Sequence, residues 1–411
     1  MKTKNPISFL IKIAAFLLLS IIIITSCKKE KIDNDSGNDP IPVEPGVAIT
    51  NPLCFTAEEG RVSIEISTSE DYVALYDFEY SYDNVVWNRF TPNYSIIVLA
   101  EAGEKVYFRG HNLQGINPFH DAFDENNNYL GPCAKFKTND KAVALSGNVM
   151  SLIDTVYREK PLPKNCFFGL FAWTSVTSAP ELPATTMSSY CYGSMFANCS
   201  NLTTVPELPA TTLADYCYSY MFLGCVSLFE TPELSAMTLA PYCYQGMFSS
   251  CHGLTTTPEL LATTMAPYSY ENMFSQCMGL TTARELPATT LAEYCYHAMF
   301  QSCYNLTTPP DLPATSLSPY CYSGMYADCD ALTRAPELPA PNLVEGCYCD
   351  MFACADNLSS IKVYFTEWLY DEATYWWLGQ TATYGTFYCP SSLPQEFGFD
   401  RIPENWTVET F

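Results

Sequence analysis

The stretch Leu202-Thr-Thr-Val-Pro-Glu-Leu-Pro-Ala-Thr-Thr-Leu-Ala-Asp-Tyr-Cys-Tyr-Ser-Tyr-Met-Phe-Leu-Gly-Cys225 is the clearest copy of a 26-residue unit that occurs seven times between residues 180 and 358. Its register holds without a gap. The recurrent methionines are Met195, Met221, Met247, Met273, Met299, Met325 and Met351. A fixed period of this length predicts a solenoid, in which each unit buries its apolar side against its neighbours.

Each unit divides into two halves with different patterns. Residues 202–205 are rich in β-branched side chains and predict one short parallel strand, which Pro206 limits because proline donates no ladder hydrogen bond. Residues 212–215 have the spacing of a helix-capping box. The apolar residues that follow are four apart, as on one face of a helix: Leu213, Cys217, Met221 and Cys225. We therefore predict an α/β solenoid with one short strand and one short helix per coil.

The order Met-Phe-x-x-Cys-x-x-Leu, followed by a proline-bounded apolar stretch, resembles the leucine-rich repeat of bacterial surface proteins of the BspA type. The match extends over residues 180–358. The resemblance implies a leucine-rich-repeat-like coil and a lipid-anchored, cell-surface protein that adheres or binds rather than catalyses. It implies no particular ligand.

The N-terminal segment resembles a bacterial lipoprotein signal peptide. Residues 1–27 carry lysines, then an apolar run from Ile13 to Ile24 that is short for a membrane span, and end in Ile-Thr-Ser-Cys27. Cys27 is the predicted lipidation site. Lys28 follows in place of the aspartate associated with inner-membrane retention, so we expect an outer-membrane protein that faces the cell exterior. Residues 28–45 are acidic and proline-rich and predict a flexible tether.

Residues 46–140 lack the period and predict a small antiparallel β-sandwich of immunoglobulin-like size, because Val62–Ile66 alternates between apolar and polar side chains. Cys54 and Cys133 lie near its two ends, and either a disulfide or two free thiols fits. Residues 141–179 and 359–411 depart from the repeat and are expected to cap its N-terminal and C-terminal ends.

Composition narrows the partners. The formal net charge is −24, from 20 Lys and Arg against 44 Asp and Glu, which disfavours nucleic acid and anionic lipid. Membrane contact is therefore expected only through the lipid on Cys27. We expect a partner protein or a glycan at the cell surface.

The repeated cysteines invite a disulfide or metal interpretation. Pairing at positions such as Cys191 and Cys199 is weakened by Ser269, which replaces one partner, and by the ~12 Å that separates residues eight apart on a helix. Buried free thiols fit better. Cys347-Tyr-Cys349 lacks zinc-site spacing, so no metal is predicted. The four histidines are scattered and no nucleophile or phosphate motif is present, so neither an enzyme nor a cofactor is expected.

Two columns of the repeat are candidate ligand-binding surfaces. The acidic column is Glu181, Glu207, Glu233, Glu259, Glu285, Asp311 and Glu337. It fits a solvated row that keeps the protein soluble, or a row that takes calcium or basic groups of a partner. The aromatic column includes Tyr216, Tyr242, Tyr268, Tyr294 and Tyr320, and a second tyrosine follows each two residues later. Since a buried cysteine separates them, at least one of these tyrosine columns should be partly exposed.

Two functions follow from these surfaces. The first is a non-enzymatic surface lipoprotein that acts as an adhesin or protein-binding scaffold. The second is a glycan-binding accessory lipoprotein of the outer membrane, which the tyrosines and the β-sandwich would favour because aromatic rings offer contact area at low entropic cost.

Overall fold

The computed structural model describes residues 46–411 except 69, 118–133, 158–160 and 370–371. The predicted signal peptide with its lipidation site Cys27, the tether, and Cys133 lie outside the described residues. All described residues fall within one compact unit. Their regular structure consists of strands in several small sheets, with two short 3₁₀-helices, η2 (Glu70–Leu75) and η3 (Val149–Leu152).

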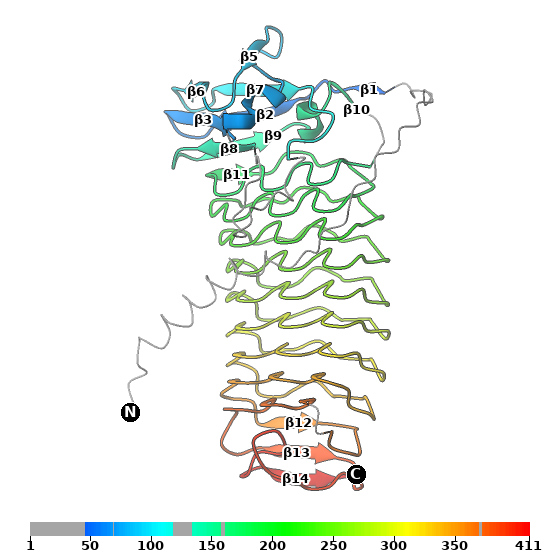
Figure 1. Ribbon diagram of the computed structural model, residues 1–411. Helices are drawn as coiled ribbons and strands as arrows, with labels where there is room; N and C mark the ends of the chain where they lie inside the picture. The colour runs from blue at the N-terminus through cyan, green and yellow to red at the C-terminus, as the bar shows by residue number, and fades with distance from the viewer. Residues whose placement is uncertain (1–45, 69, 118–133, 158–160, 370–371) are drawn as a thin grey trace, which may run out of the picture. The chain divides into compact units, whose positions relative to one another are not determined.

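The N-terminal part holds two sheets that face each other (Figure 1). The larger has the order β11-β9-β2-β7-β4-β5, from β2 (Leu53–Ala57), β4 (Phe78–Ser81), β5 (Asn88–Phe90), β7 (Lys105–Gly110), β9 (Val143–Ser146) and β11 (Val176–Ser178). The smaller has the order β6-β3-β8, from β3 (Val62–Ser67), β6 (Ile96–Leu99) and β8 (Lys135–Thr138). A separate pair joins β1 (Val47–Ala48) to β10 (Val156–Tyr157).

Alternation along the strands directs one side of each sheet inward. In β3 every second residue is buried, as the sequence predicted for residues 62–66. The Phe55 ring on β2 lies 4.8 Å from that of Phe136 on β8, which joins the two sheets. The segment predicted to cap the repeat contributes β9 and β11 to the larger sheet, where they pair in parallel.

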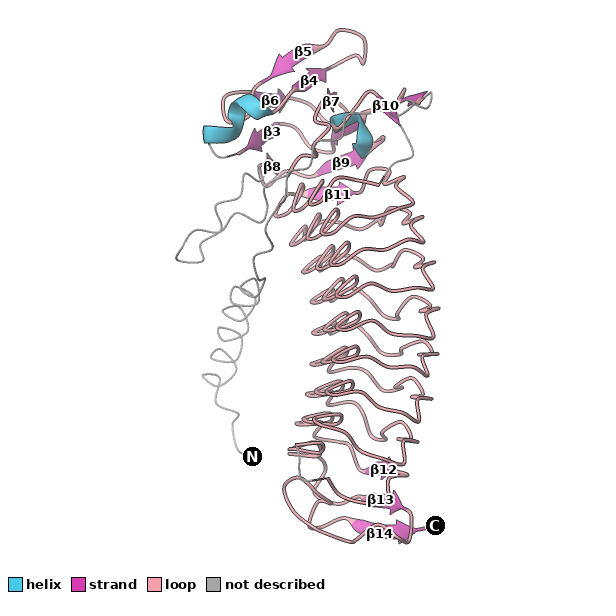
Figure 2. Cartoon of the chain, turned by 45° about the vertical axis from the view of Figure 1, so that its right-hand side comes forward, coloured by secondary structure: helices cyan, strands magenta, loops and turns pink. Residues whose placement is uncertain are grey.

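Residues 179–359, all of which are described, run as coils one above another (Figures 1 and 2) and contain no helix and no named strand. The predicted helix in each coil is therefore wrong, as is the predicted strand. The first half of each coil, such as residues 202–213, is an extended arm that meets its neighbour through a few backbone hydrogen bonds, as Thr203 N with Thr177 O at 3.0 Å, and at isolated bridges such as Leu234 with Leu260. Its recurrent prolines, which cannot donate a ladder hydrogen bond, account for the missing strand.

The second half of each coil, such as residues 215–226, is a ribbon of consecutive turns. Alternate amides bond within the ribbon to the carbonyl three residues back, as Met221 N does to Tyr218 O at 3.2 Å. The amides between them bond to the next coil, as Phe222 N does to Met247 O at 2.9 Å. An α-helix would direct every amide to the carbonyl four residues back within its own segment. Half of this ribbon's amides are instead satisfied only by stacking.

The turn ribbon requires a left-handed residue at every fourth position. In one coil these are Tyr216 at φ 58°, Tyr220 at φ 54° and Gly224 at φ 70°. The same three positions recur from Asn165, Gly169 and Trp173 to Glu372, Trp376 and Gln380. A four-residue backbone repeat places every fourth side chain on one side, which explains why the ribbon shares the spacing of a helix face.

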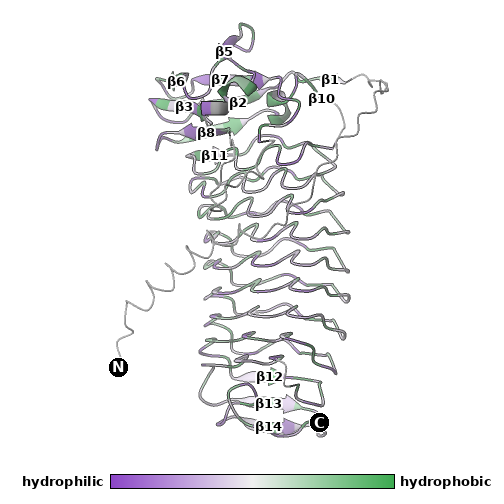
Figure 3. Ribbon diagram, viewed as in Figure 1, coloured by the Kyte–Doolittle hydropathy of each residue, from purple (hydrophilic) through white to green (hydrophobic). Residues whose placement is uncertain are grey.

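The inner side of the stack is dry and continuous. The recurrent leucine, methionine, phenylalanine and both cysteine positions are fully buried, and the coils alternate between hydrophobic and hydrophilic segments (Figure 3). In the first six coils a cysteine thiol donates to a phenylalanine carbonyl of the preceding turn ribbon, as from Cys225 Sγ to Phe196 O and from Cys251 Sγ to Phe222 O, both at 3.1 Å. The second cysteine column therefore links neighbouring coils.

Both ends of the stack continue this interior. The ring of Phe171 stacks on Phe136 of β8 at 5.5 Å and on Phe196 of the first coil at 5.5 Å. At the other end, Trp377 stacks on Tyr348 at 6.4 Å beside a parallel sheet of β12 (Ser360–Lys362), β13 (Thr386–Cys389) and β14 (Thr407–Thr410). Within the segment predicted to cap the C-terminal end, Trp377 is fully buried.

Two glycines at the same left-handed position provide a matched test of this packing. Gly246 and Gly324 have φ +57° and +62°, but a Cβ on Gly246 would overlap the Tyr220 ring, whereas one on Gly324 would lie 3.8 Å from Ala298 Cβ. We expect Gly246→Ala to lower the free energy of unfolding by about 1–3 kcal/mol more than Gly324→Ala, measured by urea denaturation. Equal losses in the free energy of unfolding for the two variants would show that the Tyr220 ring moves aside without strain.

Candidate binding surfaces

The acidic column lies on the outer side of the extended arms, and all seven of its predicted members are exposed. Some are held by neighbours. Glu181 accepts a hydrogen bond from Asn51 Nδ2 at 2.8 Å, and Glu259 forms an ion pair with Arg284 at 3.5 Å. Hydrogen bonds from Tyr364 and then Lys362 lower the pKa of Glu337, so this carboxylate is stabilised in its charged form. The column offers a row of negative charge with fixed spacing.

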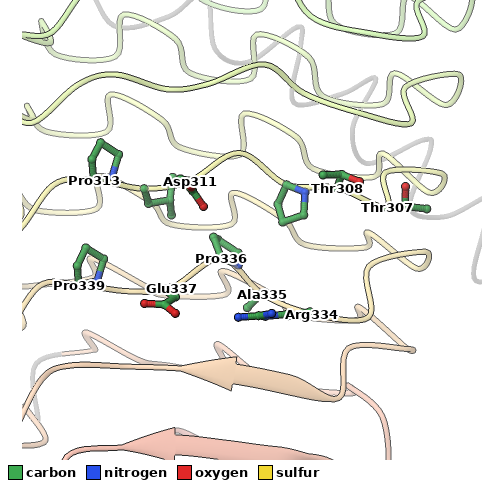
Figure 4. A pocket seen from close by; sticks show the side chains of 11 residues that line it. Thr307, Thr308, Asp311, Pro313, Arg334, Ala335, Pro336, Glu337 and Pro339 are labelled. Atoms are coloured by element: carbon green, nitrogen blue, oxygen red, sulfur yellow. The ribbon is translucent and has the colours of Figure 1, made fainter.

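A shallow cavity of about 660 Å³ opens on the arms of the sixth and seventh coils (Figure 4). Asp311 and Glu337 of the acidic column line it together with Arg334, on a floor that includes Leu312 and proline rings. The side chains of Asp311 and Arg334 stand on facing coils. The lining holds charges of both signs and no histidine or cysteine, so its chemistry suits binding of a polar group.

The first tyrosine column forms a ladder of parallel rings. Successive centroids from Tyr190 to Tyr320 are 4.4, 4.3, 4.4, 4.8 and 4.7 Å apart, with interplanar angles of 10° or less. The members are Tyr190, Tyr216, Tyr242, Tyr268, Tyr294 and Tyr320, and all are half-buried. Each occupies a left-handed position, which costs a bulky residue backbone strain that the stacking must offset.

The second tyrosine column points inward and is buried from Tyr192 to Tyr348. The expectation that at least one column is partly exposed is therefore confirmed, and the exposed one is the ladder. Its ring faces are covered by the rings above and below. A ligand therefore meets ring edges and hydroxyl groups, whereas the sugar stacking expected of this column would need open faces.

A series of three contacting polar side chains breaks the repetition and was not predicted from the sequence. Gln245, Glu271 and His297 occupy the same position in three successive coils. Gln245 Nε2 donates to Glu271 Oε2 at 2.7 Å, and His297 Nδ1 lies 3.3 Å from Glu271 Oε1. The histidine ring also packs edge-on to Tyr294 at 5.5 Å. The spacing of 26 residues was the available signal, because His297 stands in register with two other large polar side chains.

The remaining histidines do not join this series. His111 lies 3.9 Å from Asp154, and His252 Nδ1 lies 3.0 Å from the carbonyl of Gln276, while His120 is outside the described residues. Within the described ranges, no group of three or more His, Cys, Asp or Glu side chains is placed to hold a metal ion.

The cysteines of the repeat are free thiols, including Cys191 and Cys199, and so is Cys54 in β2. Cys191 and Cys199 are unpaired, as expected, although the helix that would separate them by ~12 Å is not formed. Burial raises the pKa of Cys217, Cys277 and Cys295 to about 12. These thiols therefore lack the thiolate character that nucleophilic or metal-binding cysteines need.

Within residues 46–411, apart from the undescribed segments, no helix has the length and apolar composition to cross a bilayer. Comparison of the chain with protein-family models, with curated proteins and with solved structures gives no significant match.

Proposed function

We propose that the chain is a non-enzymatic lipoprotein of the outer membrane, anchored through Cys27 and facing the cell exterior, that acts as an adhesin or protein-binding scaffold. In this proposal the stacked coils form a leucine-rich-repeat-like solenoid of the BspA type, with the turn ribbon in place of a helix, behind an immunoglobulin-like sandwich. Its binding face is the outer side of the extended arms.

The observation that carries the proposal is the uniform exposed face on a continuous core. Side chains at alternate positions of each arm are buried, and those between them form long exposed columns of threonine, glutamate and proline. A repeated flat face of this kind suits an extended protein contact. The acidic column favours partners with basic groups, because complementary charge raises the association rate and suppresses wrong partners.

Two measurements on cells test this proposal. We expect protease added to intact cells to degrade the protein, and an antibody to its repeats to label unpermeabilised cells. Globomycin, which blocks lipoprotein signal cleavage, should cause the precursor to accumulate, and Cys27→Ala should release the protein from membranes. Full protection from protease on intact cells, with digestion after lysis, would exclude an adhesin.

Calcium is one of the alternatives that the sequence leaves open for the acidic column. We predict no saturable calcium binding at millimolar concentration, because the column supplies one carboxylate per coil whereas calcium takes six to eight oxygen ligands. Isothermal titration calorimetry checks this. Stoichiometric heat that disappears in Glu207→Gln and Glu233→Gln would contradict it.

A further inference from the structure

Exposed large apolar side chains are confined to one stretch of the repeat. Between residues 180 and 358, all of which are described, they are Val226, Phe229, Met237, Leu261 and Met278. Phe229 is 56% exposed, Met237 is 68% exposed and Leu261 is 44% exposed. These three residues lie on the arms of the third and fourth coils, and the other exposed positions on the arms of this repeat are polar, charged or proline.

The columns of Phe229 and Met237 hold mostly threonine in the other coils. Phe229 stands where Thr203, Thr255, Thr281, Thr307 and Thr333 stand. Met237 stands where Thr211, Thr263, Thr289 and Thr315 stand. Leu261 stands where Ser235 stands in the third coil and where proline stands in the others. Since threonine, serine or proline satisfies the stack at these positions, packing does not require Phe229, Met237 or Leu261. Three large apolar side chains in place of the usual residues, all on two adjacent arms, therefore indicate a surface with its own role.

These side chains share one face with the acidic column. In the third arm, Phe229, Glu233 and Met237 are exposed while Pro232, Leu234 and Ala236 are buried, the alternation of an extended chain. The bridge between Leu234 and Leu260 sets the register, so Glu233 lies beside Glu259 and Leu261 lies next to Ser235. Phe229 and Met237 are eight residues apart, at most ~26 Å along the arm. We call Phe229, Glu233, Met237, Glu259 and Leu261 the apolar-acidic patch.

Charge selects the occupant of the apolar-acidic patch. Glu259 is paired with Arg284, but Glu230 and Glu233 form no ion pair within the described part of the chain. Arg284 and Arg334 are the only Lys or Arg residues between 180 and 358. A second copy of this chain, with its net charge of −24, and an anionic lipid surface would both be repelled.

We propose that the apolar-acidic patch docks a protein partner that presents a basic side chain between apolar groups. The partner's apolar groups contact Phe229, Met237 and Leu261, and its basic group lies against Glu233. Phenylalanine and methionine are enriched at the cores of protein interfaces, whereas a central carboxylate fixes register and orientation. This inference rests on the proposed protein-binding function and gives it a location and a partner chemistry.

A phage-displayed library of random 12-residue peptides, selected on the purified full chain at low salt, tests the patch. We expect the enriched peptides to carry a net positive charge with aromatic or aliphatic residues on both sides. Their affinity should fall at least tenfold for the triple variant Phe229→Thr, Met237→Thr, Leu261→Ser. Each change installs a residue that occupies the same column in another coil, so the fold should be kept, which circular dichroism and thermal melting check.

Two further variants separate charge from packing and location. Glu233→Gln should slow association and weaken its dependence on salt. The control Thr315→Ala, Thr333→Ala alters the same two columns three and four coils away, at exposed positions outside the shallow cavity, and should leave binding unchanged. Enriched peptides that bind the triple variant as tightly as the original chain would overturn this location while leaving a protein-binding function in place. No enrichment, or enrichment of acidic peptides, would overturn the proposed docking chemistry, whereas protease protection on intact cells would remove the adhesin itself.

Discussion

The protein is expected to unfold cooperatively in mildly alkaline solution, from about pH 9 upward, while it stays folded at neutral pH. Its core holds two columns of thiols and one of phenols whose pKa values burial raises. The pKa of Cys217, Cys277, Cys295 and Cys347 is raised to about 12 from an ordinary value of 9.0, and that of Tyr218 and Tyr296 is raised well above 10.0.

The loss of stability with rising pH follows from the linkage between protonation and folding. Above pH 9 the unfolded chain releases thiol protons that the folded chain retains, so each added pH unit favours unfolding. The contribution of these groups is complete below pH 9 and is lost between about pH 9 and 12. Phenol ionisation of the unfolded chain adds to the loss from about pH 10.

Circular dichroism and absorbance at 295 nm, recorded together against pH, check this. Exposed tyrosines such as Tyr82 and Tyr94 ionise without unfolding, but the phenolate absorbance of the buried column should appear only together with the change in circular dichroism, because that column ionises only when the core opens. Ellman's reagent at pH 8 should find the buried repeat thiols unreactive until denaturant is added. Phenolate absorbance that accounts for all the tyrosines while circular dichroism is unchanged would contradict the prediction.

The second large effect is expected from Phe248→Ala in the middle of the stack. Phe248 is fully buried, and its ring stacks on Phe222 and Phe274 at 5.6 Å on either side. Truncation removes contacts with both neighbours and leaves a cavity that the coil backbone, bonded above and below, has little freedom to fill. We expect the free energy of unfolding to fall by about 3–5 kcal/mol, measured by urea denaturation.

Two variants control for this result. Thr256→Ala, at an exposed position of the next arm, should change stability by no more than about 0.5 kcal/mol. Phe248→Tyr should lower the free energy of unfolding less than Phe248→Ala, because Tyr326 occupies the same column in the sixth coil. Some loss is still expected, because the buried hydroxyl of Tyr326 has no hydrogen-bond partner and a tyrosine at position 248 would bury its hydroxyl in the same way. A loss below about 1 kcal/mol for Phe248→Ala would show that neighbouring coils close the cavity.

The period and the buried columns could be predicted because they depend only on which residues recur. Met221, Phe222 and Cys225 return in phase, and all are buried. The backbone between them could not be predicted from that pattern. Leu213, Cys217, Met221 and Cys225 are four apart on a helix face and equally on a four-residue turn ribbon. The apparent capping box at residues 212–215 was consistent with a helix but did not exclude a turn ribbon.

A signal for the turn ribbon was nevertheless present. The third left-handed column carries Asn198, Gly224, Ser250 and Asp328, and the second carries Asn272, Gly324 and Asp350. Glycine, asparagine and aspartate tolerate left-handed backbone best, so their recurrence every fourth residue argues against a helix. Tyrosine in the first column obscured this signal, since its backbone preference is opposite and only the stacked ladder explains it.

The candidate surfaces divide in the same way. The acidic column could be placed outside from sequence, because six of its seven members follow a proline, and Glu285 follows Arg284. The choice between the two tyrosine columns could not be made, since Tyr216 and Tyr218 are both flanked by small and polar residues. The pairing of Glu271 with Gln245 and His297 depends on the 26-residue register, which the positions of the histidines alone do not reveal.

The alternating amides of the turn ribbon also bear on how such a gene changes length. Every junction between coils presents the same row of donors to the same row of acceptors, as Tyr218 to Cys243 and Tyr244 to Ser269. Loss or duplication of one whole 26-codon segment therefore restores an identical seam, whereas a shift by another number of residues takes the buried columns of neighbouring coils out of register. Unequal recombination at this locus should consequently yield longer or shorter stacks of coils that still fold, so that the length of the stack is an inherited variable.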